Sequence, residues 1–307
     1  MKKHLFVLGV CLLSLFIISC KRQNAPNTYS VIPYPNSLVQ EEGTFAFNKK
    51  TKMICTSLLD SASQEVVRNF SALLNNVAGL KTECIVDEEK SDKNIVFFDL
   101  DTSIADEGYS LDIDPSKIII KASSAAGFYY AVQSLKQLLP IAVYGDKESD
   151  SVEKWEVPCA HIDDAPRFSY RGMHLDVARH FFSVDEVKRY IDLLAMHKLN
   201  VFHWHLTENQ AWRLESKIFP MLNDSINTVR MPGKYYTLEE ARELVDFCKQ
   251  HQVMLIPEID MPGHSAAFIR TFRHDMQSPE GMKILKLLID EVCETFDVPY
   301  LHIGTDD

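Results

Sequence analysis

The sequence predicts an α/β protein in two parts, a small α+β domain followed by a region in which strands and helices alternate. Beyond residue 169, short apolar runs alternate with amphipathic stretches of helical period, in the order βαβαβαβ. This order is typical of a parallel sheet with helices outside it. Before residue 145, strands and helices follow one another without that alternation. The 307 residues are 46% hydrophobic, which provides for a packed core and suggests two domains.

The N-terminus has the pattern of a bacterial secretion signal. Lys2 and Lys3 precede an apolar stretch that ends at Cys20, and this ending resembles a bacterial lipoprotein signal. The pattern predicts a signal peptide over residues 1–19, cleavage before Cys20, lipidation of its thiol, and a polar tether over residues 20–30. We therefore expect a protein of the bacterial cell envelope that touches the membrane only through a lipid anchor. The alternative is an ordinary signal with a chance cysteine.

Charge and cysteine content exclude several classes of partner. The net charge is −11, and without the two signal lysines 30 basic residues face 43 acidic ones, a net charge of −13. An acidic chain is not expected to bind nucleic acid or another polyanion. The five cysteines after Cys20 are an odd number at wide spacings, and no CxxC occurs. Neither a disulfide framework nor a zinc knuckle is expected.

Residues 31–144 are predicted to form the α+β domain. Apolar residues recur at helical period over residues 61–77, and Gly79 is a plausible stop. A second helix is predicted over residues 125–139, before Pro140. Three strands are predicted, at residues 94–100, 109–113 and 117–121. No catalytic pattern of ionisable residues occurs here, so we interpret this part as an accessory domain.

A linker and a second domain are predicted to follow. Residues 145–168 are rich in Asp, Glu, Ser and Pro, which is typical of a linker. Residues 169–307 form the alternating region. Its strands are predicted at residues 169–177, 200–206, 253–259 and 300–304. Four strands over this length are about half of a closed eight-stranded barrel, which usually needs about 250 residues. Either a smaller doubly wound sheet or a barrel truncated after about its fourth strand is expected.

Helix starts support the alternation. Ser183 with Glu186 and Thr237 with Glu240 have the spacing of capping boxes, in which the first side chain and the third helical residue satisfy each other's backbone donors. A third helix of this region is predicted over residues 279–296.

Ionisable residues gather after each of the four predicted strands. They are Asp176, Arg179 and His180, then His203, His205, Glu208 and Asn209, then Glu258, Asp260 and His264, and finally Asp306 and Asp307. Because the carboxyl ends of parallel strands meet at one edge, the pattern predicts an active site there. Two adjacent carboxylates can divide labour, one staying ionised and the other holding a proton. Trp204 and Trp212 flank the second strand end, and their rings either stack on a sugar or lie in the core.

Four stretches resemble motifs of glycoside hydrolase family 20, the β-N-acetylhexosaminidases. They are RGMHLDVARHF at residues 171–181, HWHLTENQAWR at 203–213, PEIDMPGH at 257–264 and HIGTDD at 302–307. The α+β region resembles the accessory domain that usually precedes the catalytic barrel of that family. The resemblance therefore implies a (β/α)8 TIM-barrel type catalytic domain, present through about its fourth strand.

The resemblance also implies a reaction and roles. Members release terminal N-acetylglucosamine or N-acetylgalactosamine from glycans with retention, and the substrate's own acetamido oxygen is the nucleophile. Asp306 would orient the acetamide, and position 307 would be the general acid. Arg179 would bind sugar hydroxyls, and Glu208 with His264 would form a supporting pair. No metal and no cofactor are implied.

Four positions depart from the family pattern. Glu208 stands where Asp is frequent, Asn209 replaces an acidic residue, Thr305 replaces a common Gly, and Asp307 replaces Glu. The last departure matters most, since a carboxyl group displaced by about 1 Å can cost on the order of 100-fold in rate. The sequence thus also allows a weak or inactive, truncated lipoprotein that at most binds amino sugars.

A metal-dependent hydrolase is a further alternative. His203 and His205 form an HxH pair at a strand end, an arrangement that can place two imidazoles on one side to bind zinc. His264 and Asp306 would complete such a site. The oligomeric state does not follow from the sequence.

Overall fold

The computed structural model describes residues 29–87 and 93–305 of the chain. The chain divides into two units, Met1–Ser30 and Val31–Asp307, and every helix and strand below belongs to the second. The predicted signal peptide, Cys20, and the predicted catalytic pair Asp306 and Asp307 lie outside the described residues. Within the described ranges, no helix has both the length and the apolar character that a membrane span requires.

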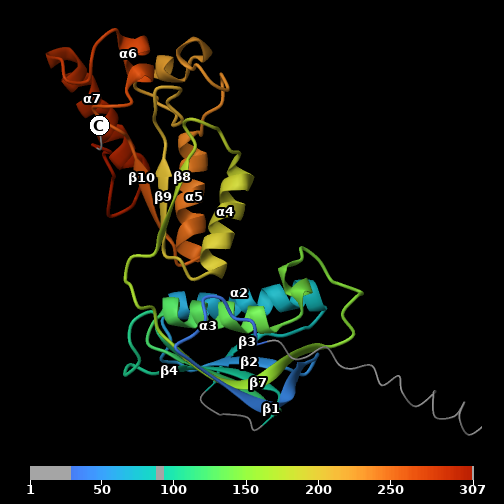
Figure 1. Ribbon diagram of the computed structural model, residues 1–307. Coiled ribbons are helices and arrows are strands. Elements are labelled where there is room, and N and C mark those ends of the chain that lie inside the picture. Colours follow the sequence, from blue (N-terminus) through green and yellow to red (C-terminus); the bar gives the residue numbers. More distant parts are fainter. Residues whose placement is uncertain (1–28, 88–92, 306–307) are drawn as a thin grey trace, which may run out of the picture. The chain divides into compact units, whose positions relative to one another are not determined.

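The first part of the chain forms a seven-stranded mixed sheet (Figure 1). Its strands are β1 (Ser37–Phe47), β2 (Lys52–Cys55), β3 (Cys84–Val86), β4 (Ile95–Leu100), β5 (Tyr109–Ile113), β6 (Lys117–Ala122) and β7 (Trp155–Asp164). They lie in the order β1-β7-β5-β6-β4-β2-β3. The strands from β3 to β6 in this order pair in parallel, and β5, β7 and β1 pair antiparallel. The three strands predicted for this part are confirmed as β4, β5 and β6.

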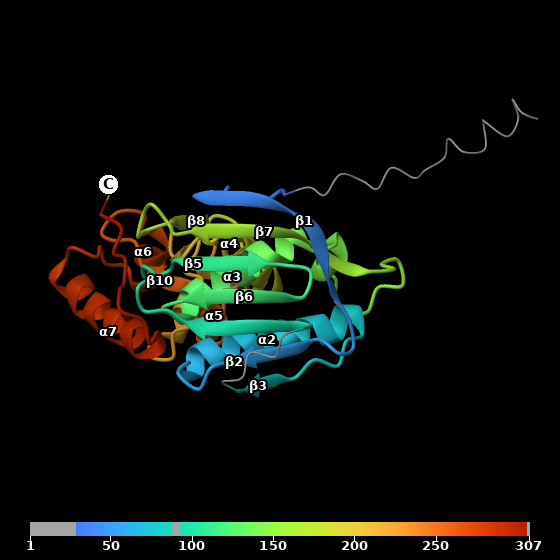
Figure 2. The ribbon, with the colours of Figure 1, turned by 90° about the horizontal axis from the view of Figure 1, so that it is seen from below.

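Two helices, α2 (Ser61–Ala78) and α3 (Ala125–Leu138), cover one face of this sheet (Figures 1 and 2). Asp60 caps α2 by accepting from the backbone N–H of Ser63, and Gly79 ends the helix at a φ of 59°. The buried face of α2 carries the residues that the helical period selects, namely Val66, Val67, Phe70, Leu74 and Val77. A short 3-10 helix, η1 (Ile141–Tyr144), follows α3. Both predicted helices are confirmed.

The linker predicted over residues 145–168 is wrong for its central stretch. Trp155–Asp164 forms β7, which lies between β1 and β5 and pairs with both. The acidic and Ser-rich composition belongs mainly to residues 145–154, which precede this strand. Within it, Val157, Cys159 and Ile162 are fully buried. Their apolar side chains place this segment in the core of the first sheet.

The second part builds a parallel three-stranded sheet in the order β10-β9-β8. Its strands are β8 (Gly172–Asp176), β9 (Val201–His205) and β10 (Met254–Glu258). The helices are α4 (Val184–Met196), α5 (Leu238–Gln250), α6 (Ala266–Phe272) and α7 (Pro279–Thr295), with 3-10 helices η2 (Pro220–Asn223) and η3 (Ser225–Asn227). Both predicted capping boxes are present, at the starts of α4 and α5. The alternation of strand and helix is confirmed up to β10.

The fourth strand, predicted at residues 300–304, is absent from the described part of the chain. Only an isolated parallel bridge joins His302 to Glu258. The His302 N–H donates to the Pro257 carbonyl at 2.9 Å, and the Ile259 N–H donates to the His302 carbonyl at 3.0 Å. Gly304 and Thr305 then adopt φ values of 70° and 76°. This left-handed backbone departs from the extended conformation that a ladder needs, and so the pairing stops after one bridge.

Polar contacts connect the two sheets. Both terminal nitrogens of Arg171 donate to the carboxylate of Glu107, at 2.8 and 3.1 Å. The Nζ atom of Lys198 donates to Asp164 and to the Tyr109 hydroxyl, each at 2.8 Å. A bidentate guanidinium–carboxylate pair is strong and also restricts the relative orientation of its two partners. These contacts therefore fix the position of β8 relative to the first sheet.

Candidate active site

The loops after β8, β9 and β10 bring three of the predicted site residues together. Arg179, Glu208 and His264 each come from a different loop, and Arg179 Nη2 and His264 Nδ1 both contact Glu208 Oε1. The Glu208 side chain is only 1% exposed, whereas that of Arg179 is 46% exposed. A buried carboxylate therefore lies between two basic groups at the carboxyl edge of the sheet, where the sequence predicted a site.

Asp176, at the end of β8, fixes the position of Arg179. One carboxylate oxygen accepts from the backbone N–H groups of Ala178 and Arg179, both at 2.9 Å. The other accepts from Arg179 Nη1 at 2.6 Å. Burial alone would raise the pKa of Asp176, but the hydrogen bonds from Arg179 outweigh it and hold the pKa below its usual value. Asp176 is thus an ionised anchor for the arginine.

Arg213, to which sequence reasoning assigned no role, supports the same loop through hydrogen bonds. Its guanidinium is fully buried, and its hydrogen-bond acceptors among the described residues are backbone carbonyls. The acceptors are the carbonyls of Val177, Ala178, Arg230, Met231 and Lys234. The side chain thereby ties the residues just before Arg179 to the segment that leads into α5.

The loop after β9 is tied to the loop after β10. The backbone N–H of Asp260 donates to the Thr207 hydroxyl at 2.9 Å, and the Ala266 N–H donates to the side-chain oxygen of Asn209 at 3.1 Å. Arg270 also donates to the Asn209 carbonyl at 2.7 Å. Asn209, which departs from the family pattern, therefore serves as an acceptor at the start of α6. These bonds hold Glu208 next to His264.

His264 has a left-handed backbone, with a φ of 47°. Such a conformation is costly for a residue with a Cβ atom and occurs preferentially at functional sites. It directs the imidazole onto Glu208, a contact that two of the family motifs predicted.

The two tryptophans predicted as either sugar contacts or core residues belong to the core. Trp204 is fully buried and Trp212 is 2% exposed. The Trp204 ring packs edge-on against Tyr236 and Phe296, at centroid distances of 4.7 and 6.2 Å. Neither ring offers a face to a ligand.

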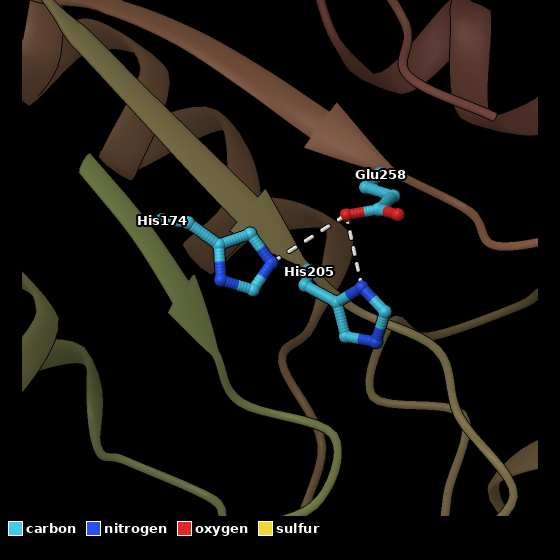
Figure 3. A group of neighbouring side chains, drawn as sticks. All are labelled: His174, His205 and Glu258. Atoms are coloured by element: carbon cyan, nitrogen blue, oxygen red, sulfur yellow. Dashed lines mark ion pairs between the residues drawn. The ribbon is translucent and has the colours of Figure 1, made fainter. Parts of the chain in front are cut away.

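A second cluster surrounds Glu258 at the end of β10. His203 Nε2 and His205 Nδ1 lie 2.6 and 2.9 Å from Glu258 Oε2. His174 Nε2 lies 3.7 Å from the same oxygen, and His302 Nδ1 lies 3.5 Å from Oε1. Figure 3 shows His174 and His205 directed toward this carboxylate. The predicted strand-end charges thus form two groups, one centred on Glu208 and one on Glu258.

The contacts between Glu258 and the neighbouring imidazoles shift the pKa values of both kinds of group. Burial would raise the pKa of Glu258, but the contacts with His174, His203 and His205 hold that pKa far below its usual value. Burial likewise opposes charge on His205, yet the contact with Glu258 raises the pKa of His205. The carboxylate is ionised and His205 favours its charged form.

Two members of the Glu258 cluster were assigned no role from the sequence. His174 and His302 lie within quoted motifs but received no role. The signal was present in the strand period: His174 and Asp176 share one face of β8, as His203 and His205 share one face of β9. Of the alternative metal ligands His203, His205, His264 and Asp306, the first two contact Glu258 and His264 contacts Glu208, while Asp306 lies outside the described residues.

Comparisons with known proteins agree with the motifs. Residues 168–278 match the catalytic domain of glycosyl hydrolase family 20, and residues 28–165 match domain 2 of the same family. A curated β-hexosaminidase from Porphyromonas gingivalis is 33% identical over 97% of this chain and 42% of its own length.

Solved structures are also similar. A family 20 β-N-acetylhexosaminidase from Streptomyces coelicolor aligns with a TM-score of 0.81 and 30% identity, covering 92% of this chain and 60% of that chain. A family 20 exo-β-N-acetylglucosaminidase from Vibrio harveyi, in complex with N-acetylglucosamine, aligns with a TM-score of 0.76 and 30% identity over 90% of this chain and 46% of that one.

The chain spans less than half the length of the first curated relatives, 42% and 49%. Within that span, the two matched domains follow each other in order, and the aligned structures cover both sheets. The Arg179, Glu208 and His264 group lies in the loops where the motifs place it. The chain belongs to glycoside hydrolase family 20, whose fold is a TIM barrel with an N-terminal domain.

Proposed function

We propose that this protein is a β-N-acetylhexosaminidase, which removes terminal N-acetylglucosamine or N-acetylgalactosamine from glycans with retention of configuration. The observation that carries the proposal is the buried Glu208 carboxylate between Arg179 and His264, at the carboxyl edge of parallel strands. The names of the similar proteins, among them an N-acetylglucosaminidase bound to N-acetylglucosamine, support the same substrate class.

Arg179 is suited to hold the sugar. One side of its guanidinium is engaged by Asp176 and Glu208, and nearly half of the side chain faces solvent. The remaining donors of its rigid planar fork are free to bind hydroxyl groups in a fixed direction. Glu208 and Asp176 keep the arginine in place as the sugar enters.

Ile303 and Gly304, just before Asp306, lie beside the loop that follows β10. Ile303 accepts from the Met261 N–H at 3.1 Å, and a Cβ atom at Gly304 would meet the Asp260 side chain. This close approach explains the glycine in the HIGTDD motif. In the proposed reaction Asp306 orients the acetamide, and the carboxyl group at position 307 protonates the leaving oxygen and then activates water.

In finer detail, residues 169–305 correspond to the opening of the barrel: three strands and a segment that bridges to the third. We propose that the shorter carboxyl arm of Asp307 weakens acid catalysis. If a carboxyl group is misplaced by about 1 Å, the rate falls on the order of 100-fold.

The experiment is hydrolysis of 4-nitrophenyl N-acetyl-β-glucosaminide and of the corresponding galactosaminide by the purified protein. We expect turnover that survives EDTA, falls by about 100-fold or more in Asp306→Asn, and rises in Asp307→Glu. Arg179→Lys should mainly raise KM, because Lys lacks the planar fork. Exposed Arg242→Lys is the matched control.

Three results would argue against this function. Turnover that disappears with EDTA, returns with Zn²⁺ and keeps this dependence in His174→Asn would favour the metal-dependent alternative. A folded protein that binds N-acetylglucosamine without turnover, and gains none in Asp307→Glu, would favour a non-catalytic amino-sugar-binding protein. Turnover unchanged in Asp306→Asn would remove the assigned role.

The envelope location is also a proposal, and it rests on the N-terminal apolar stretch that ends at Cys20. Metabolic labelling with a palmitate analogue should label the wild-type protein and place it in the membrane fraction. Cys20→Ser should abolish both the label and the membrane association. A labelled Cys20→Ser protein, or an unlabelled wild-type protein, would contradict lipidation at this residue.

A further inference from the structure

The Glu258 cluster has no part in the proposed reaction, yet it gathers more metal-binding side chains than any other place in the described residues. Glu258 is 5% exposed and lies at the end of the edge strand β10, with imidazoles contributed by the adjacent strand β9 and by β8 beyond it. We propose that His174, His205 and Glu258 bind one divalent transition-metal ion of the zinc type at the carboxyl edge of this sheet.

The spacing of the ligand atoms fits such an ion. His174 Nε2 and His205 Nδ1 lie 3.7 and 2.9 Å from Glu258 Oε2, and all three atoms lie within 4.8 Å of one another. Zinc bonds of about 2.0–2.1 Å in a tetrahedron place ligand atoms about 3.3 Å apart. The two separations from Glu258 bracket this value, and both imidazoles are directed at the carboxylate (Figure 3).

The strand register explains why the three side chains meet. Glu258 pairs with His205 across β10 and β9, and His205 pairs with Asp176 across β9 and β8. His174 is two residues before Asp176 and therefore points to the same face of β8. The ion would link β8 to β10, two strands that do not pair with each other.

The surroundings provide what a zinc-binding histidine needs. The Nε2 atom of His205 is buried and has no hydrogen-bond partner in the part of the chain that the structure describes. A ligand atom of His205 lies within 4.8 Å of those of Glu208 and Asp260, which are 1% and 3% exposed. Metal-bound imidazoles usually donate their second N–H to a carboxylate of this kind, which orients the ring.

The charge of the surrounding side chains also favours a bound cation. Glu208, Asp260 and Glu258 are three carboxylates buried in one neighbourhood, and burying several negative charges together is costly even where basic side chains lie near them. A divalent cation offsets part of this charge. With three protein ligands, the fourth position of the ion is left to water.

The test uses the full chain, stripped with EDTA, dialysed and titrated with Zn²⁺ by isothermal calorimetry, with the zinc content measured by elemental analysis. We expect one ion per chain, and a Co²⁺ form with the visible absorption bands of a tetrahedral site. Glu258→Gln and His174→Asn should each weaken binding by more than the roughly 10–100-fold that loss of an outer-shell partner causes. Exposed His274→Asn is the control and should bind as the wild type does.

His174→Asn keeps the test sound if Glu258→Gln fails to fold, because the replaced ring is half exposed. Three outcomes would overturn the proposal: no stoichiometric uptake, uptake unchanged in His174→Asn, or uptake lost in His302→Asn and kept in His174→Asn. The last would assign the ion to the other group around Glu258, made of His203 and His302. Metal binding is read without any glycoside, so these outcomes are independent of the proposed hydrolase activity.

Discussion

Arg213 shows how a single buried residue supports the site without touching a ligand. Its guanidinium donates to five backbone carbonyls, two of which immediately precede Arg179. Burial lowers the pKa of Arg213 to about 10, so the side chain remains charged at neutral pH. The loop geometry therefore depends on a cation that is stabilised by carbonyl dipoles.

Replacing Arg213 by Met should destabilise the protein severely. Each buried carbonyl left without a donor costs about 1–3 kcal/mol, so we expect a loss on the order of 3 kcal/mol or more in the free energy of unfolding. Lys at this position keeps the charge and up to three donors and should cost less. Urea denaturation measures both.

The control for Arg213→Met is Arg242→Met on the exposed side of α5, which should stay within about 0.5 kcal/mol of the wild type. If Arg213→Met unfolds at the wild-type urea concentration, the carbonyl network does not contribute to stability.

Single residues were predictable from the sequence only as chemical types. The motifs identified Arg179, Glu208 and His264, and the structure brings these three together. The motifs could not show that Trp204 faces the core or that four histidines lie around the Glu258 carboxylate. Those facts depend on which face of a strand points inward and on which strand lies beside it.

At the scale of elements, α4 begins directly after the loop that carries Arg179. The backbone N–H of Ser183 donates to Glu186 Oε2 at 2.7 Å, and the Ser183 hydroxyl accepts from the Glu186 N–H at 3.4 Å. This capping box satisfies donors that the first helical turn would otherwise leave unpaired. It also fixes where the loop ends and the helix starts.

Ser183→Ala should lower the free energy of unfolding by about 1 kcal/mol, within the range of about 0.5–2 kcal/mol for lost N-caps. Ser183→Asp retains an acceptor and adds a negative charge at the positive end of the helix, so it should be close to the wild type. Thermal denaturation followed by circular dichroism would compare them. Equal destabilisation by Ala and Asp would show that the cap hydrogen bond is not the cause.

Elements whose signals are local were predicted, and elements that depend on a partner were not. The capping boxes and helical periods gave α2, α3, α4, α5 and α7, because those signals lie within one segment. β7 was mistaken for a linker because the acidic and Ser-rich residues 145–154 before it dominate the composition, while its partner strand β1 lies more than a hundred residues earlier in the chain. Residues 300–304 were expected to be a strand, although an apolar run becomes one only where a neighbour continues the ladder.

At the scale of the molecule, Glu107 joins the two sheets. Its carboxylate accepts from Arg171 and, at 3.1 Å, from Asn200, both in the second part of the chain. Burial would raise the pKa of Glu107, but the hydrogen bonds and charge of Arg171 outweigh it and lower that pKa below 4.5. The ionised carboxylate is therefore the form that the folded protein stabilises.

A depressed folded-state pKa means that Glu107 contributes stability above the ordinary pKa of an unfolded glutamate and loses that contribution as the pH falls through the lower folded-state pKa. Acid should thus weaken the connection between the sheets. We expect the wild-type urea midpoint to fall between pH 6 and pH 3, and Glu107→Gln to lower the midpoint at pH 6 and to reduce that fall. Because other carboxylates also titrate in this range, the informative quantity is the difference between variants. Exposed Glu153→Gln should keep the wild-type dependence, and an identical fall in Glu107→Gln would show that the Arg171 pair does not couple the sheets.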